Sequence, residues 1–278
     1  MCWIVAFCVS PCGRLGIFRR CWHSDTGSEH RRRMMRWLSE LLGRSKPATA
    51  SVVDPVQQAR LAALPALVQA ADTDLMQQPL LVLDLETNGL DVRRDRVLSI
   101  GAVRIEGGRI PLAKTFERVL CVDIELRPDS QLIHGLTQAD LAAGVAPAGA
   151  ILDLLEYGAD AVWLAYHAEF DRRMLARCTQ EALGLALVHA PYDVAELAPM
   201  LCPEMAVPRA GLDHWIQALN LPMPARHHAV ADAMVTAEIM LVLLQRARAA
   251  GMQTWRDLDM ALAQWRRRQA QAGKAVFC

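Results

Sequence analysis

Two carboxylates at the end of an apolar segment, Asp84 and Glu86, are the first residues in the sequence that could carry chemistry. They belong to LLVLDLE (80–86), which is predicted to be a buried strand. Because strand side chains alternate, both carboxylates share one face and the intervening leucines share the other. Neighbouring carboxylates repel each other and resist desolvation, so a bound divalent cation would stabilise both. The alternative is that the strand ends here and that water solvates both groups.

A third carboxylate, Asp171, lies in the first turns of a helix predicted over 168–183, directly after a strand predicted over 161–166. The carboxyl end of a strand in an α/β sheet is where sites gather. Glu169 is about 200° around the helix from Asp171, so the two cannot face one site. Taken alone, Asp171 could instead simply stabilise the positive N-terminus of its helix.

A histidine pair and a further aspartate open a long apolar helix predicted over 229–250. His227 and His228 precede this helix, and Asp232 lies in its opening turns. A loop histidine and an aspartate on the adjoining helix could share one pocket. His228 and Asp232 would share a helix face if the helix started early, whereas His227 lies outside that register. Spacing alone therefore does not choose between the histidines, and a solvated helix start is the alternative.

The elements that must position these residues predict an α/β fold. Three strands come first and alternating helices and strands follow, which predicts a mixed sheet, antiparallel at its start, flanked by helices. The later strands and helices should bring the carboxylates to one edge of that sheet. In chain order the other expected elements are a helix at 55–71 interrupted near Pro65, a hairpin of strands at 97–108 and 114–120, helices at 137–143 and 148–158, a short strand before Asp193, and helices at 194–201, 212–219 and 255–272.

Several other polar and aromatic residues are predicted to be structural. Asp193 and Glu196 are expected to form a capping pair at the start of the helix over 194–201. Trp215 and Trp255 lie on amphipathic helices and are expected in or near the core. Cys8 and its neighbouring cysteines fit no common zinc-ligand spacing.

Composition and charge exclude several classes of protein. The chain has 278 residues, of which 53% are hydrophobic and 22% charged, so global disorder is excluded. Thirty basic and thirty acidic side chains give formal neutrality, which argues against non-specific coating of nucleic acid. No apolar run approaches the roughly 20 residues of a membrane span, and the eight cysteines form no disulfide pattern. We therefore expect a cytoplasmic protein with reduced thiols and no membrane partner.

Four segments are predicted along the chain. Residues 1–33 are expected to be a disordered or mis-annotated tail, with translation starting at Met34 or Met35. Residues 34–78 form a helical extension and linker, 79–250 the main domain, and 251–278 a C-terminal helical extension.

The motifs together resemble those of the DEDDh (DnaQ-like) family of 3′-to-5′ exonucleases, which includes the proofreading epsilon subunit of bacterial DNA polymerase III, ribonuclease T and oligoribonuclease. The resemblance spans about residues 79–250, with the motifs in the family's order. They are LVLDLETNGLD (81–91), LIHGLTQADL (132–141), AYHAEFDRRML (165–175) and HHAVADA (227–233). The resemblance implies a ribonuclease H-like fold.

The resemblance also implies roles for individual residues. Asp84, Glu86, Asp171 and Asp232 become the metal-binding carboxylates, and the family's His-x4-Asp spacing selects His227 as general base. The implied cofactor is a pair of Mg²⁺ (or Mn²⁺) ions per site, which suits oxygen ligands. The implied substrate-binding residues are Thr87, Leu90, Asp129 and His134. Asn88 and Tyr166-His167 depart from the family's usual residues without touching an expected ligand.

The expected function is a metal-dependent 3′-to-5′ exonuclease that acts on the 3′ end of single-stranded DNA in proofreading or repair, with a DNA polymerase subunit as a candidate partner. Two alternatives stay open: a short-RNA exoribonuclease of the oligoribonuclease or ribonuclease T kind, and a non-catalytic, polymerase-associated module that binds nucleic acid.

Overall fold

The computed structural model describes residues 54–65, 72–222 and 227–275. Every described element belongs to one compact unit, Ala48–Cys278. The predictions for the tail (1–33), for a start at Met34 or Met35, and for most of the 34–78 extension lie outside the described residues.

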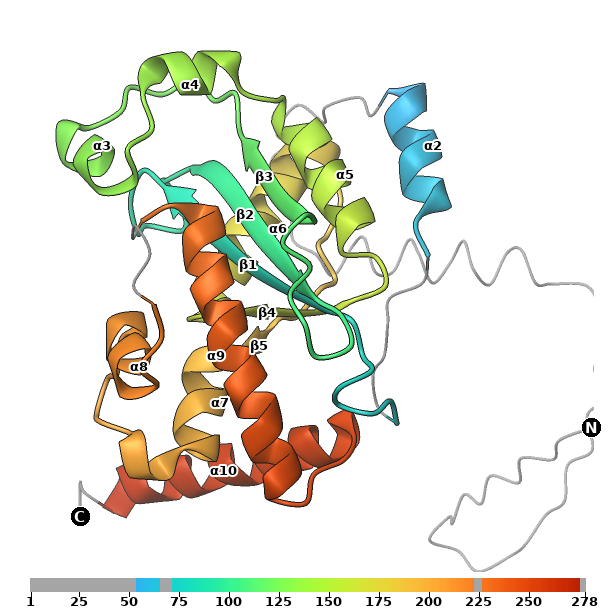
Figure 1. Cartoon of the computed structure of the whole chain (residues 1–278). Helices are drawn as coiled ribbons and strands as arrows, with labels where there is room; N and C mark the ends of the chain where they lie inside the picture. The colour runs from blue at the N-terminus through green and yellow to red at the C-terminus, as the bar shows by residue number, and fades with distance from the viewer. Residues whose placement is uncertain (1–53, 66–71, 223–226, 276–278) are drawn as a thin grey trace, which may run out of the picture. The chain divides into compact units, whose positions relative to one another are not determined.

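Five strands form one mixed sheet in the order β3-β2-β1-β4-β5 (Figure 1). The hairpin partners β1, β2 and β3 run antiparallel, whereas β4 is parallel to β1 and β5 is parallel to β4. This arrangement confirms the predicted fold class, an antiparallel start followed by alternating helices and strands. The strands are β1 (Leu80–Thr87), β2 (Val97–Ile105), β3 (Thr115–Val119), β4 (Val162–Ala165) and β5 (Tyr192–Asp193).

Helices flank the sheet, and Figure 1 shows the long helix α9 lying across one face. In the described part of the chain, no helix is both long and apolar enough to cross a membrane. The helices are α2 (Pro55–Ala63), α3 (Pro128–His134), α4 (Gln138–Ala143), α5 (Pro147–Tyr157), α6 (Ala168–Leu183), α7 (Val194–Leu201), α8 (Leu212–Ala218), α9 (Ala229–Ala249) and α10 (Trp255–Ala275).

The central strand β1 is buried on both faces, which explains its nearly continuous apolar sequence. Leu80 and Val82 pack into a core with α7 and α9. Leu81 and Leu83 point the other way, into a core with α5 and α6. Asp84 and Glu86 continue the parity of Leu80 and Val82, so the strand directs both carboxylates toward the α9 side of the sheet.

Helix α3 was not predicted, although its ends carry recognisable signals. Pro128 occupies its first turn, and Gly135 closes it in the left-handed region at φ 70°. Its apolar residues Leu132 and Ile133 are exposed rather than aligned on a core-facing stripe. A helix of seven residues without that stripe gives no hydrophobic periodicity to detect.

The last helix, α10, is packed into the domain along one face. Trp255, Leu258 and Leu262 are almost completely buried in the core shared with α7 and α9. The hydroxyl of Tyr192 donates to Asp259 Oδ1 at 2.8 Å, which links α10 to β5. The helix predicted over 255–272 is therefore confirmed, as is the burial predicted for Trp255.

Candidate active site

The end of β1 presents Asp84 and Glu86 at the α9 side of the sheet. Asp84 is half-buried, and the exposed fraction of Glu86 is 9%. Asp84 pairs with Gly101 of β2 across the antiparallel ladder, and Glu86 pairs with Ser99. The two carboxylates therefore lie on well-paired backbone near the centre of the sheet.

Helix α9 brings the third carboxylate, Asp232, to this edge. The helix starts directly over Gly101, where an added Cβ atom would lie 2.2 Å from the carbonyl carbon of Ala229 and 2.3 Å from the amide nitrogen of Val230. Only glycine permits this approach, because any side chain at position 101 would occupy the space of the helix backbone. Asp232, in the first turn of α9, is 94% buried as a result of this packing.

Asp84, Glu86 and Asp232 form one acidic cluster. One carboxylate oxygen from each lies within 4.8 Å of the other two. Like charges this close repel one another by roughly 4 kcal/mol per pair at 4 Å in a partly buried setting. The cluster offers only carboxylate oxygens as ligands, and these oxygens lie close together and are largely shielded from water. Such a site fits a hard divalent cation such as Mg²⁺ or Mn²⁺.

Asp171 is the predicted ligand outside this group of three, and it lies on the first turn of α6. Its side chain is 96% buried. Burial, and then the negative charges of Asp193 and Glu86, raise the pKa of Asp171 well above its ordinary value. The structure therefore brings three predicted ligands together and places the fourth within the electrostatic field of Glu86.

The two histidines before α9 have different surroundings, although both are exposed. His227 adopts the left-handed conformation at φ 63°, and its backbone N–H donates to Asp232 Oδ2 at 3.2 Å. The ring of His228 lies 3.2 Å from Glu117 Oε1 of β3. His227 is thus tied by its backbone to a residue of the acidic cluster, whereas the ring of His228 is directed at a neighbouring strand.

The residues predicted to bind substrate are spread over the loop after β1 and helix α3. The hydroxyl of Thr87 donates to the carbonyl of Gly89 at 2.8 Å, which shapes that loop. Leu90 is 83% exposed, and Asp129 is also exposed. The side chains of Leu90 and Asp129 are therefore accessible to a ligand.

His134, also predicted to bind substrate, is buried at the end of α3, and burial lowers the pKa of its ring. The backbone N–H of Leu136 donates to its Nδ1 at 3.1 Å. Nε2 must then carry the proton, which it donates to Ser130 Oγ at 2.7 Å. Both ring nitrogens thus bond within the α3 turn, so the structure gives His134 a role in shaping that turn.

Arg127 was not identified from the sequence, yet it connects α3 to the loop after β1. Its guanidinium donates to the carbonyl of Asn88 and lies 3.5 Å from Asp95 Oδ1. The contact joins residues 39 positions apart, so no local sequence pattern could have predicted it. Arg127 holds the two segments with predicted substrate-binding residues against each other.

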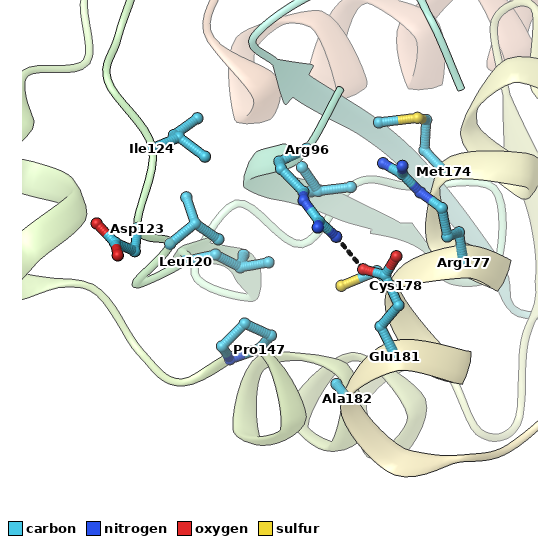
Figure 2. A pocket seen from close by; sticks show the side chains of 12 residues that line it. Arg96, Leu120, Asp123, Ile124, Pro147, Met174, Arg177, Cys178, Glu181 and Ala182 are labelled. Atoms are coloured by element: carbon cyan, nitrogen blue, oxygen red, sulfur yellow. Dashed lines mark hydrogen bonds and ion pairs between the residues drawn. The ribbon is translucent and has the colours of Figure 1, made fainter. Parts of the chain in front are cut away.

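A cavity of about 260 Å³ opens elsewhere, between α6, the start of β2 and the segment that follows β3 (Figure 2). Figure 2 shows Arg96 and Glu181 pointing toward each other across it, where they form an ion pair. Its apolar lining, including Val97 and Met174, belongs to the α5–α6 side of the sheet. None of the predicted site residues lines this cavity, so the acidic cluster, not the cavity, is the candidate active site.

Comparisons with known proteins identify relatives of this chain. The chain is 30% identical over 179 residues to a PolC-type DNA polymerase III of Thermotoga maritima, which covers 64% of this chain and 13% of that protein. It is also 30% identical over 188 residues to a DNA polymerase III subunit epsilon-like protein of Rhodobacter capsulatus, covering 66% of this chain and 26% of that one. The chain thus spans about a quarter or less of the length of these relatives.

Solved structures show the same fold. E. coli exonuclease I in complex with a dT13 oligonucleotide aligns with a TM-score of 0.52 at 19% identity, over 63% of this chain and 42% of that chain. The cell-death related nuclease CRN-4 aligns with a TM-score of 0.54 at 12% identity, over 61% and 64%. The exonuclease family model, RNase T, matches residues 81–240, which is more than half of the chain and includes all four predicted carboxylates. The chain therefore belongs to the RNase T family of exonucleases.

Proposed function

We propose that the protein is a metal-dependent exonuclease that hydrolyses the terminal phosphodiester bond at the 3′ end of single-stranded DNA. The observation that carries the proposal is the acidic cluster, in which Asp84, Glu86 and Asp232 converge from a strand and a helix far apart in sequence. The exonuclease family membership supports it, because the cluster lies inside the matched residues. Two of the relatives are DNA polymerase III proteins. This relationship favours DNA over RNA as the substrate, and it favours a polymerase subunit as the partner.

The four carboxylates would hold two Mg²⁺ or Mn²⁺ ions. Bound ions supply positive charge to the scissile phosphate and make water a better nucleophile at neutral pH. Asp84, Glu86 and Asp232 share one short-range cluster, and Asp171 lies close enough to Glu86 for the negative charge of Glu86 to raise its pKa. Their repulsion without a cation is the reason to expect tight binding, because a cation removes an unfavourable interaction as well as adding favourable ones.

His227 is proposed as the general base that accepts the proton of the attacking water. Its exposed ring is available for this role, and its backbone N–H is anchored on Asp232. A neutral imidazole can accept a proton from water in the transition state. The loop after β1, with Thr87 and the exposed Leu90, would position the terminal nucleotide.

The experiment uses 5′-labelled single-stranded DNA and RNA oligonucleotides of one sequence, incubated with Mg²⁺, with Mn²⁺ or with EDTA. We expect DNA to shorten stepwise from the 3′ end only when a metal is present. Faster degradation of RNA would instead support the exoribonuclease alternative, and metal binding without shortening would support a non-catalytic module.

Asp84→Asn is the matched loss-of-function variant, and Asp54→Asn is its control. Asp84→Asn removes the negative charge of a proposed metal ligand. It should lower the rate of DNA hydrolysis by at least about 10³-fold, because a bound metal ion would be lost or displaced. In EDTA the same variant should melt no lower than the native protein, because it relieves repulsion within the cluster. Asp54 caps α2 away from the cluster, and asparagine caps helices equally well, so Asp54→Asn should keep full activity. Full activity of Asp84→Asn would contradict the proposal.

A further inference from the structure

Asp193 lies where β5 ends, beside Ala165 at the end of the parallel strand β4. Its Oδ1 accepts from the backbone N–H of Ala195 at 2.9 Å, which confirms the predicted cap of α7. Glu196 does not complete a capping pair as predicted, because its carboxylate binds the guanidinium of Arg266 on α10 instead. Asp193 is therefore the side chain that caps α7.

The same Asp193 oxygen has a second partner across the sheet edge. It accepts from the backbone N–H of His167 at 2.9 Å. His167 lies in the turn between β4 and α6, so one carboxylate links the start of α7 to the start of α6. A charged acceptor makes such hydrogen bonds stronger than a neutral one would.

The β4–α6 turn needs an external anchor of this kind. His167, the residue before α6, adopts the left-handed conformation at φ 62°, which costs a residue other than glycine about 1 kcal/mol. Within the described structure, the His167 side chain makes no capping hydrogen bond of its own. The hydrogen bond from His167 to Asp193 offsets both costs and fixes where α6 begins.

The start of α6 determines the position of Asp171. Asp171 lies in the first turn of this helix, three residues after Ala168, and is 96% buried. A shift of the turn would move its carboxylate by a similar distance. Mg²⁺ requires ligands at about 2.0–2.1 Å in near-octahedral geometry, so displacements of about 0.5 Å matter.

We infer that Asp193 is a positioning residue for the metal site: by accepting from the backbone N–H of His167, its carboxylate fixes the start of α6 and with it the position of Asp171. The inference rests on the proposed function, because Asp171 matters in this way only if the cluster binds metal. It adds a role to a residue whose evident task is to cap α7.

The test measures Mn²⁺ affinity directly, by the loss of the EPR signal of unbound Mn²⁺, and uses three substitutions at position 193. Asp193→Ala removes the acceptor and should weaken Mn²⁺ binding at least tenfold. Asp193→Asn keeps an oxygen that can accept the same N–H groups and should stay within about threefold of the native affinity. The serine of Asp193→Ser can still cap α7, but its side chain is too short to reach the N–H of His167 equally well. We therefore expect Asp193→Ser to lose Mn²⁺ affinity as Asp193→Ala does. It replaces Asp193→Ala in the test if that variant does not fold.

Asp257→Ala is the matched control. Asp257 accepts from the backbone N–H groups of Gln253 at 3.0 Å and Thr254 at 2.9 Å, so its loss also removes a two-amide cap. It should lower the melting temperature by about as much as Asp193→Ala does and leave Mn²⁺ affinity unchanged.

The outcomes separate the inference from the proposed function. Unchanged affinity in folded Asp193→Ala or Asp193→Ser would overturn the inference, since Asp193 would then be a cap and nothing more. Equal loss in Asp193→Asn and Asp193→Ala would overturn it too, because charge rather than the acceptor would be responsible. A native protein that binds no Mn²⁺ would refute the metal site itself, and the inference with it.

Discussion

At the residue scale, His227 and His228 are neighbours in the sequence with different environments. The backbone of His227 contacts Asp232, while the ring of His228 pairs with Glu117. Position in the sequence motif and environment in the structure thus favour the same residue as general base. The distinction could not be made from helical spacing, because His227 lies before the helix and its left-handed backbone turns it out of the helical register.

Substitution of each histidine tests this assignment. His227→Ala should lower kcat by about 10²–10⁴-fold, the usual contribution of a general base, with little change in Mn²⁺ affinity. His228→Ala removes an exposed contact with Glu117 and should change kcat less than threefold. Single-turnover rates on one DNA oligonucleotide provide the comparison, and a reversed order of the two effects would transfer the role to His228.

A third histidine, His189, makes stability depend on pH. Its ring stacks on Trp163 with centroids 4.1 Å apart, and burial lowers its pKa to about 4. Its Nδ1 has no hydrogen-bond partner among the described residues. Because the folded pKa lies below the unfolded value near 6.5, the unfolded chain binds the proton first, and stability falls as the pH drops from about 6.5 to about 4.

His189→Phe should remove this dependence and keep the stacking on Trp163. The difference in unfolding free energy between pH 7 and pH 4.5 should shrink by up to about 2–3 kcal/mol, as measured by urea denaturation in EDTA. An unchanged pH dependence in His189→Phe would mean that other groups are responsible.

At the element scale, the contact between β2 and α9 creates the site. Gly101 is the backbone partner of Asp84, and the first residues of α9 lie directly on it. Two carboxylates of the cluster, Asp84 and Asp232, are therefore related by one backbone-to-backbone contact. An ordinary side chain at position 101 would separate the strand from the helix.

Gly101→Ala should therefore impair both stability and metal binding. Overpacking of this kind typically costs 1–3 kcal/mol, and the displaced α9 should weaken Mn²⁺ affinity at least tenfold. Gly149→Ala is the control, because the nearest atom to its added Cβ lies at an ordinary 3.8 Å and alanine favours the interior of α5. Thermal melts and Mn²⁺ titrations measure the two effects, and native affinity in Gly101→Ala would show that α9 can shift without disturbing Asp232.

The elements themselves were largely predictable from the sequence. Helices α6 and α4 occur where the sequence predicted them, and a capping box of Thr137 and Asp140 begins α4, because apolar periodicity and capping residues are local signals. Helix α3 was missed because its apolar residues are exposed. The contacts of Arg127 and the second role of Asp193 were out of reach because they join segments that only the folded chain brings together.

At the scale of the whole molecule, the core extends past the residues matched by the family. Helix α10 begins after residue 250, yet it buries Leu258 and Leu262 against the core that also holds α9. The domain boundary predicted at residue 250 was based on the extent of the motifs. The motifs indicate which residues form the candidate site, but they do not indicate which helices pack in the core. Stability of the site should therefore depend on residues with no role in catalysis.

Leu262→Ala tests that dependence. Removal of a buried leucine side chain should cost about 2–5 kcal/mol of unfolding free energy. Met260→Ala, at a position 53% exposed on the same helix, should change stability by less than about 0.5 kcal/mol. Denaturant titrations of the two variants give the comparison, and equal stabilities would mean that α10 is dispensable.

The close seating of α9 on Gly101 also has a consequence during protein synthesis. The acidic cluster needs Asp232, and the core that holds α9 includes residues of α10, so during synthesis the carboxylates can converge only after both helices have been made. A nascent chain that lacks these helices carries Asp84 and Glu86 without Asp232. The order of translation thus separates the synthesis of the β1 carboxylates from the assembly of the cluster.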